Sequence, residues 1–459
     1  MKSWRSRPMA ELLVAAAVTC LATAGVSGTK DLVPAPFVRS TAPVGPTPSN
    51  WPTGHQNLRN NAAFLPTRIP WLGKGPWWMD RFRYKLSSDT PVIHGILYLT
   101  SGDVHGRSPS QQGTVWAISA RTGRIIWRHQ LPNNAFSEPV VDHGRVFIGV
   151  GNIRFHVLPH SHTLIRGTGV SGIWCFNAAT GDLLWVNHTS GSDQPPPTVV
   201  GTTLYAVSGS RKLYAIDVAN GHRRWTLPLP AYSSRSSPRV VGHMLYLGGA
   251  HAYSVIAVNL QTRKIAWVTP IRGAVEGVDD TTLAYGNHRL YTAAVTMAKP
   301  GPRGIPQRHA VLYALDASNG HQVWSRVLTT GSPPFLKATG TPTLAGSEIY
   351  VGNALTGVVS AVYAGNGHIQ WQFNAGSPVK KPPVVTPQRV YFLSLHGTLF
   401  ALNHQGHLMG KSTLLPAVNV RGPVLANHTL FAIANTATNG YLFAMPRTQI
   451  VRPVTRKKA

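Results

Sequence analysis

Carboxylates are scarce in this sequence. Its 459 residues include 15 Asp and Glu against 43 Lys and Arg, which gives a formal net charge of +28 at pH 7. A chain with few carboxylates has few groups that must be protonated as the pH falls, so acid removes little of its stability. The same imbalance creates a positive field that concentrates small anions near the protein. Acid adaptation and an anionic ligand are therefore both open interpretations.

The sequence also lacks the clustered basic segments and recognisable modules that are typical of nucleic-acid-binding proteins. We therefore expect no nucleic-acid partner. The C-terminal residues 447–459 are rich in Lys and Arg, and we expect them to form a basic, solvated tail rather than a binding arm.

Cysteine is almost absent, since Cys20 and Cys175 are the only two. Residues 1–24 have the features of a secretory signal, with positive charge followed by the apolar run Leu12–Ala22 and a cleavage site at Ala22-Thr23-Ala24. Loss of this signal removes Cys20, so the mature chain is expected to hold no disulfide and no cysteine-rich metal site. Lipidation of Cys20 stays open, although the residues before it form a poor lipobox.

No apolar run is long enough to span a bilayer, and Leu12–Ala22 is too short. The sequence therefore predicts export to the periplasm or to the cell surface and outer membrane, without a transmembrane segment. Residues 25–76 begin rich in Pro and Thr, and we expect a linker and an N-terminal segment there.

Helical stripes are missing as well, whereas 44 Gly and 36 Pro indicate many turns. The stretch Val311–Trp324 places two short β-favouring runs on either side of the turn Asp316–Gly320. The same pattern recurs at Val115–Trp127, Ile173–Trp185, Leu213–Trp225, Val255–Trp267, Leu312–Trp324, Val359–Trp371, Leu399–Met409 and Tyr441–Met445. A period of 40–58 residues with four short strands per unit predicts an all-β fold, a β-propeller.

The repeats predict eight four-stranded antiparallel blades within residues 77–446. Arg421–Met445 supplies only three strands of the last blade. Trp77–Leu86, at the other end of the chain, is expected to supply its fourth strand. This pairing closes the ring and removes the open sheet edges.

The repeat resembles that of the pyrroloquinoline-quinone (PQQ) enzymes, whose consensus is close to Leu-Tyr-Ala-Leu-Asp-Ala-x-x-Gly-x-x-x-Trp. Leu312–Trp324 and Leu213–Trp225 match it almost position for position. The resemblance implies that each Trp packs against the neighbouring blade. Arg263 replaces the expected Gly in the fourth repeat and Gly410 replaces the Trp in the seventh, so we expect these two blades to be less regular.

The long insertions Gly102–Gln112, Gly151–Ser171 and Met297–Arg308 all connect the second and third strands of their blades. They are therefore expected on one face, where function is concentrated. The connection Val275–Thr281 enters the fifth blade from the same face and carries Glu276, Asp279 and Asp280. We predict that these carboxylates are catalytic and that Arg272 binds an anionic substrate, the alternative being a solvated acidic turn.

Three histidines in one insertion, His156, His160 and His162, suggest a metal site. They lack the surrounding groups that such sites need, and in acid they would be protonated and repel a metal ion. We therefore expect no metal and no cofactor.

Three functions are compatible with the resemblance. Quinone-dependent dehydrogenases of this repeat class usually carry an adjacent cysteine pair and acidic calcium ligands in a longer chain, which disfavours that function here. The chain is also similar to the propeller lipoprotein of outer-membrane β-barrel assembly, which implies a non-catalytic scaffold with assembly proteins as partners. Similarity to the tetrathionate hydrolases of acidophilic sulfur oxidisers implies an exported, acid-adapted hydrolase with a small dianionic substrate. The basic composition favours the last.

Overall fold

A computed structural model describes residues 78–102, 112–157, 164–250, 252–332, 340–426 and 428–446. These residues all belong to one compact unit of the chain, Phe37–Ala459. The expected signal sequence, the segment 25–76, the basic tail 447–459, Cys20, His160 and His162 lie outside the described residues.

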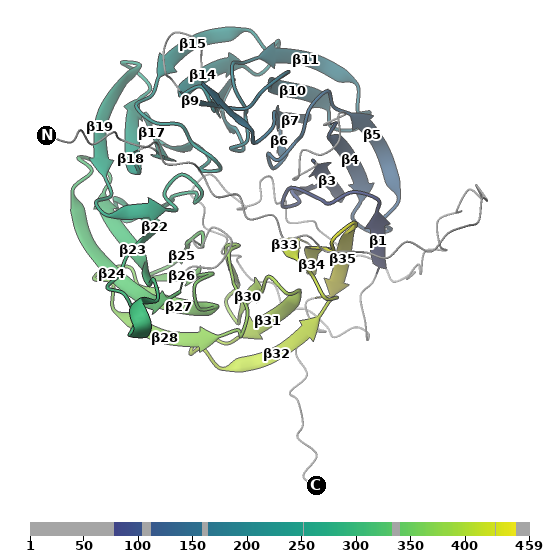
Figure 1. The fold of residues 1–459 in the computed structure, drawn as a ribbon. Coiled ribbons are helices and arrows are strands. Elements are labelled where there is room, and N and C mark those ends of the chain that lie inside the picture. Colours follow the sequence, from purple (N-terminus) through teal and green to yellow (C-terminus); the bar gives the residue numbers. More distant parts are fainter. Residues whose placement is uncertain are drawn as a thin grey trace, which may run out of the picture. The chain divides into compact units, whose positions relative to one another are not determined.

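Eight antiparallel sheets follow one another around a central axis, in chain order (Figure 1). This arrangement confirms the predicted eight-bladed β-propeller. The one helical element among the described residues is the short 3₁₀ helix η1 (Pro302–Gly304). None of the helices in the described part of the chain is long and apolar enough to span a membrane.

The first four blades are listed here from the axis outward. Blade 1 contains β2 (Val92–Ile93), β3 (Ile96–Ser101), β4 (Thr114–Ser119) and β5 (Ile125–Gln130). Blade 2 contains β6 (Val140–Asp142), β7 (Arg145–Val150), β10 (Gly172–Asn177) and β11 (Leu183–His188). Blade 3 contains β12 (Thr198–Val200), β13 (Thr203–Ser208), β14 (Lys212–Asp217) and β15 (Arg223–Pro228). Blade 4 contains β16 (Arg239–Val241), β17 (Met244–Gly249), β18 (Ser254–Asn259) and β19 (Lys264–Pro270).

The remaining blades complete the ring. In blade 5, β20 (Ala274–Glu276) and β21 (Ala284–Gly286) both pair with β22 (Arg289–Met297), which is followed by β23 (Arg308–Asp316) and β24 (Gln322–Gly331). Blade 6 contains β25 (Thr343–Ala345), β26 (Glu348–Gly352), β27 (Val358–Tyr363) and β28 (Ile369–Asn374). Blade 7 contains β29 (Val384–Val385), β30 (Val390–Leu393), β31 (Thr398–Leu402) and β32 (Leu408–Thr413). Blade 8 contains β33 (Asn419–Ala426), β34 (Thr429–Asn435), β35 (Gly440–Pro446) and β1 (Trp78–Phe82).

The ring is closed by the N-terminal strand β1, as the sequence predicted. It pairs antiparallel with β35, and Trp78 lies opposite Ala444. In blade 1 the corresponding pair is Trp127 opposite Ala117. Trp78 is therefore the outer-strand tryptophan of blade 8, contributed from the other end of the chain.

Neighbouring blades are joined by contacts between a tryptophan and a glycine. Trp127 Nε1 donates to the carbonyl of Ala178 at 3.0 Å, in the next blade. The turn glycine there, Gly181, has φ +82°, and a Cβ on it would lie 2.7 Å from the Trp127 ring. Only glycine tolerates both the backbone conformation and the close approach of the ring.

The two blades that depart from the repeat keep four paired strands each. Arg263 takes the position of the turn glycine with φ 56°, and Gly410 lies opposite Ala401 where a tryptophan is expected. The expected irregularity does not extend to strand pairing, because the missing contacts act between blades rather than within a sheet. Cys175 is fully buried, as its place in an apolar strand predicts.

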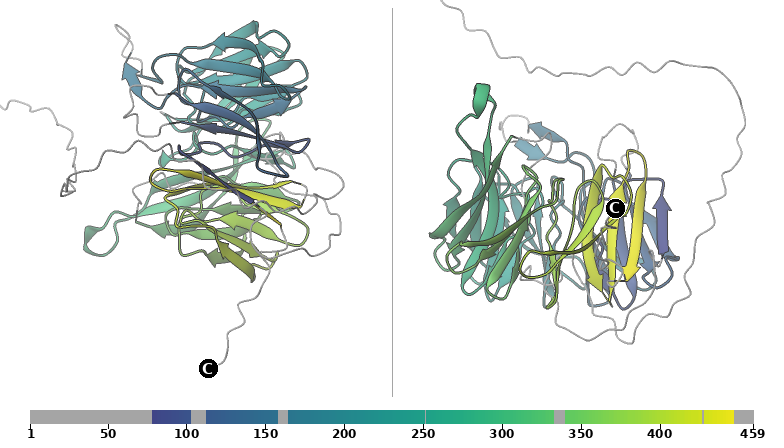
Figure 2. Two further views of the ribbon diagram at one scale, coloured as in Figure 1. Left: turned by 90° about the vertical axis from the view of Figure 1, so that its right-hand side faces the viewer. Right: turned by 90° about the horizontal axis from the view of Figure 1, so that it is seen from below.

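The long insertions connect the second and third strands of blades 1, 2 and 5, as predicted. The second of them contains the hairpin of β8 (Phe155–Val157) and β9 (Leu164–Arg166), and the third contains η1. Figure 2 shows that this hairpin and the η1 loop project from the same face of the ring. We call this face the insertion face.

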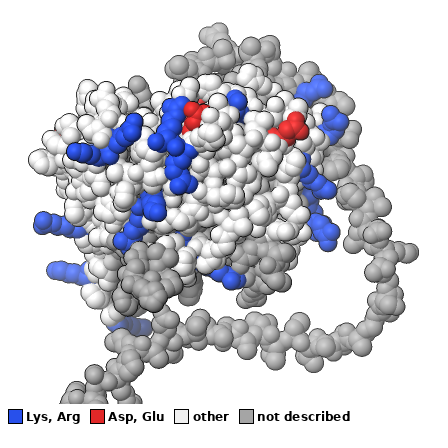
Figure 3. Space-filling view, turned by 90° about the horizontal axis from the view of Figure 1, so that it is seen from above, with Lys and Arg blue, Asp and Glu red and all other residues white. Residues whose placement is uncertain are grey.

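Basic side chains cover the outside of the ring broadly. Figure 3 shows Lys and Arg spread over one side of the molecule, with few Asp and Glu among them. On the side of the molecule that this view shows, the positive charge is therefore spread over the described surface rather than gathered in one patch.

Candidate functional site in the axial cavity

A cavity of about 450 Å³ lies where the blades meet at the axis. Most of its lining comes from the connections that lead into the innermost strands, and Ile153, Arg166 and Leu395 come from connections between second and third strands. Both kinds of connection belong to the insertion face, so the cavity belongs to that face. Its volume is within the range of small-molecule sites, about 300–1,000 Å³.

Seven charged side chains from six different parts of the chain line this axial cavity. They are Glu138, Arg166, Arg235, Asp280, Lys380, Lys381 and Arg421. Apart from Arg166, each comes just before or at the start of the innermost strand of its blade. The repeat therefore brings charged residues from blades 2, 4, 5, 7 and 8 to a common centre, although they are far apart in the sequence.

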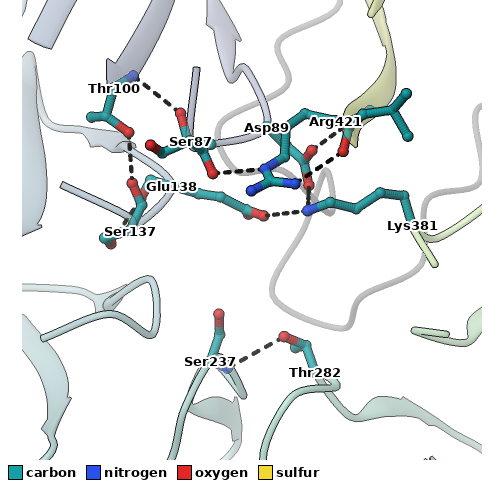
Figure 4. Close-up of polar contacts among 12 residues, drawn as sticks. Ser87, Asp89, Thr100, Ser137, Glu138, Ser237, Thr282, Lys381 and Arg421 are labelled. Atoms are coloured by element: carbon teal, nitrogen blue, oxygen red, sulfur yellow. Dashed lines mark hydrogen bonds and ion pairs between the residues drawn. The ribbon is translucent and has the colours of Figure 1, made fainter. Parts of the chain in front are cut away.

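Asp89 and Glu138 are buried at the edge of this cavity, beside the partly exposed Lys381 (Figure 4). Lys381 Nζ lies 2.7 Å from Asp89 Oδ2 and 3.7 Å from Glu138 Oε1, and the backbone amide of Gly422 donates to Asp89 Oδ1 at 2.6 Å. Although burial opposes ionisation, Lys381 and hydrogen bonds hold the pKa of Asp89 well below its usual range. Burial and the neighbouring Asp89 charge raise the pKa of Glu138 to about 8. One carboxyl group is thus ionised and the other is protonated.

Arg421 is fixed beside this cluster. Its Nε donates to the Ser87 carbonyl at 2.7 Å, and its Nη1 donates to Asn419 Oδ1 at 2.7 Å (Figure 4). Only 5% of the residue is exposed. Burial lowers the pKa of Arg421 to about 10, with a further contribution from the positive charge of Arg235. It therefore remains a cation at neutral and acid pH.

The structure separates the predicted site residues. Asp280 lines the axial cavity, whereas Asp279 is buried. The backbone carbonyl of Asp279 accepts hydrogen bonds from the amides of Ser234, Arg235 and Ser236 at 3.1, 2.8 and 2.9 Å. Asp279 thereby fixes the Arg235 segment in place, and Asp280 presents the side chain nearest to the cavity.

The other two predicted residues lie outside the cavity lining. Glu276, on β20, forms an ion pair with Arg308 of β23. Arg272 is exposed after β19. Arg166 and Arg235 are among the cations that line the cavity together with Asp280. Burial lowers the pKa of Arg166, and the Asp280 carboxylate opposes this shift by favouring the charged form.

Sequence analysis missed most of the charged residues that line the cavity, including Glu138, Arg235, Lys381 and Arg421, and it also missed Asp89 beside Lys381. The sequence held a signal for these residues, because each lies just before the innermost strand of its blade or near the start of that strand. Arg166 carried no such signal. It reaches the cavity from the end of β9, in the insertion between the second and third strands of blade 2.

No group of three or more His, Cys, Asp or Glu side chains among the described residues could hold a metal ion, and His156 is the one insertion histidine of the predicted three that is described. The described residues contain a single cysteine, Cys175, so they hold no adjacent cysteine pair of the kind found in quinone-dependent members.

Comparison with known proteins identifies the family to which this propeller belongs. The protein family described as outer membrane protein assembly factor BamB, of the PQQ-repeat type, matches residues 72–152, 149–294 and 308–444. The chain belongs to this family. The solved structure of BamB from Moraxella catarrhalis is 16% identical, with a TM-score of 0.55 over 80% of this chain and 98% of that chain, which shows a common fold.

The chain is also similar to two curated proteins that bear the name tetrathionate hydrolase. The one from Acidithiobacillus ferrooxidans is 25% identical over 83% of this chain and 84% of its own length. The one from Acidianus ambivalens is 24% identical over 88% of this chain and 85% of its own length. These similarities extend over almost the entire propeller.

Proposed function

We propose that this protein is an exported, acid-adapted hydrolase that cleaves a sulfur oxyanion such as tetrathionate in the axial cavity. The observation that carries the proposal is Asp280, which lines a cavity that also receives five cationic side chains. Similarity to two tetrathionate hydrolases over most of the chain supports the substrate class.

Hydrolysis of a polythionate breaks a sulfur–sulfur bond. The water oxygen bonds to one sulfur, and the bonding electron pair leaves on the other sulfur as a thiosulfate-level anion. We assign Asp280 the role of accepting the water proton, because it is the predicted carboxylate that lines the cavity. Asp279 positions the neighbouring backbone, and cationic side chains stabilise the charge on the leaving group.

Arg272 and Glu276 have outer roles in this proposal. Arg272 is exposed on the connection into blade 5 and contributes positive charge where the anion approaches. Glu276 is held by Arg308 and supports the position of β20 against blade 5.

The test is thiosulfate release from tetrathionate by the purified protein at about pH 3. A protein with few carboxylates is expected to lose little stability at this pH. Asp280→Asn is expected to lower the rate by about 100-fold, the usual contribution of a general acid or base. Asp182→Asn provides a matched control, since Asp182 is exposed in a turn on the opposite face. Absence of thiosulfate release under every acidic condition would refute the hydrolase.

Export to the periplasm or to the cell surface and outer membrane is part of the same proposal. The small number of carboxylates, 15 Asp and Glu among 459 residues, agrees with a location that is exposed to acid. N-terminal sequencing of the exported protein tests it, and a start after Ala24 is the expected result.

A non-catalytic scaffold in outer-membrane protein assembly is the second candidate. It is favoured by the family to which the chain belongs and by the likeness to the solved BamB. A pull-down with outer-membrane barrel-assembly components tests this function. Specific capture without thiosulfate release would favour the scaffold over the hydrolase.

A further inference from the structure

The axial cavity receives positive charge from opposite sides of the ring. Arg235 lies at the entrance to blade 4, and Arg166 Nη1 donates to the carbonyl of the adjacent Ser234 at 3.1 Å. Arg421 lies in blade 8, on the opposite side of the ring (Figure 1). Arg235 and Arg421 both line the axial cavity.

Several polar groups in the lining have no partner among the described residues. Gln194 is 2% exposed, and neither Oε1 nor Nε2 of its side chain has a hydrogen-bond partner there. Ser87 Oγ, on the blade 1 side of the cavity, is also buried and also has no hydrogen-bond partner among these residues. Arg166 Nε is buried without a partner among these residues, and Arg235 lines the same cavity. Buried polar groups that stay unsatisfied cost stability, so this pattern points to a ligand.

We propose that the axial cavity binds a dianion with one negatively charged group at each end. One end is held by Arg166, Arg235 and Gln194, and the other by Arg421 and Ser87. The identity of the natural ligand rests on the proposed function, whereas the binding itself does not. Charge-assisted hydrogen bonds at both ends satisfy the unpaired donors and remove the repulsion between the two guanidinium groups.

A ligand with a single anionic end satisfies only one side of the cavity. The guanidinium group on the other side then gains no charge-assisted hydrogen bond from the ligand, so a monoanion binds less favourably. The geometry therefore selects against monoanions of the same length. This selection distinguishes a built site from the general attraction of a basic protein for anions, which depends on charge alone.

The probes are a butane disulfonate with one sulfonate at each end and butane monosulfonate, neither of which has a sulfur–sulfur bond. Calorimetric titration of the full chain in dilute buffer is expected to show the disulfonate binding at least about tenfold more tightly, since one charge-assisted hydrogen bond corresponds to a factor of this size. Equal affinities, or no binding of the disulfonate, would overturn the proposal.

Variants locate the two ends. Arg235→Gln and Gln194→Leu are each expected to weaken disulfonate binding roughly tenfold and to bring it close to that of the monosulfonate. Ser87→Ala tests the opposite end without disturbing the bonds that hold Arg421, because Ser87 Oγ has no partner among the described residues. Arg124→Gln, which removes an exposed charge on the other face, is expected to leave binding unchanged. Similar weakening by Arg124→Gln and Arg235→Gln would contradict a defined site.

The two proposals fail in different ways. Disulfonate binding without thiosulfate release from tetrathionate supports the dianion site and refutes the hydrolase. Thiosulfate release that is insensitive to both Arg235→Gln and added disulfonate supports the hydrolase and refutes this site.

Discussion

At the scale of single residues, the axial cavity is defined by how burial changes the chemistry of a few charged side chains. Asp89 and Glu138 are both carboxylic acids near Lys381, yet the pKa of Asp89 is lowered while that of Glu138 is raised. Burial raises both pKa values, but the charge of Lys381 and the hydrogen bonds with Glu138 and Lys381 lower that of Asp89, whereas the Asp89 charge raises that of Glu138. Identical functional groups thus differ in protonation because of their neighbours.

Glu138→Gln tests this assignment. With a pKa of about 8, Glu138 holds a proton in the folded chain at pH values where the unfolded chain has released it. Its contribution to stability is therefore complete below the ordinary pKa and is lost as the pH rises through about 8. The glutamine variant is expected to match the parent at pH 4 and to exceed it by roughly 1–3 kcal/mol at pH 9. Urea unfolding across this range is the measurement, and parallel curves for both proteins would contradict the assignment.

At the scale of the structural element, the outer strand of each blade is attached to the turn of the next. Asn187 and Thr269, each two residues after a blade tryptophan, donate to the carbonyl of the next turn glycine at 2.8 and 2.7 Å. Asp80 occupies the same position after Trp78 on the closing strand, beside Gly123. Only a protonated carboxyl group can donate in that position.

Asp80→Asn is expected to make closure of the ring independent of pH. Burial raises the pKa of Asp80 to about 7, so its stabilising proton is present below the ordinary pKa near 4 and is lost as the pH rises through about 7. The asparagine variant should equal the parent at pH 4 and be more stable by roughly 2 kcal/mol at pH 8, a value reduced for partial solvent access. Thermal unfolding at both pH values measures this difference, and an equal change at both would exclude the titration of Asp80.

Gly181→Ala tests the contact between blades 1 and 2. The new Cβ would meet the Trp127 ring at 2.7 Å and adopt an unfavourable φ of +82°. We expect a loss of about 2–4 kcal/mol, from the strained backbone together with the displaced ring. Gly201→Ala is the matched control, because Gly201 also has positive φ but no atom within 4 Å. Equal losses in the two variants, measured by denaturant unfolding, would show that the Trp127 contact contributes nothing.

At the scale of the whole molecule, positive charge greatly exceeds negative charge. The strands of every blade are nevertheless paired around the ring. The chain has 15 Asp and Glu, so few favourable carboxylate interactions can be removed by acid. The Asp89–Lys381 pair is retained in acid, since the pKa of Asp89 lies well below its usual range. We therefore expect the main contacts of the propeller to persist in acid.

Retention of the fold in acid is the prediction at this scale. Near-ultraviolet circular dichroism, which reports tryptophan packing, is expected to change little between pH 7 and about pH 3. Asp89→Asn should lower stability by roughly 3 kcal/mol at both values, because it leaves Lys381 buried without its counterion. Loss of the tryptophan signal in the parent protein above pH 3 would contradict acid adaptation.

The sequence by itself determined the repeat, the number of blades and the closure of the ring. These features depend on local patterns that recur from repeat to repeat. Examples are the outer-strand tryptophan, such as Trp78, and the turn glycine, such as Gly181. It also placed the long insertions on one face and led to Asp280, because strand order decides on which face each connection lies.

The tertiary structure decided which charged residues meet. Asp89, Glu138, Arg235 and Arg421 come from different blades, and their shared place just before or at the start of an innermost strand becomes a common site only when the ring closes around the axis. Asp279 and Asp280 are adjacent in the chain, yet one is buried and the other lines the cavity. Burial and charge proximity depend on packing in three dimensions, and for that reason only the folded ring identifies the axial cavity.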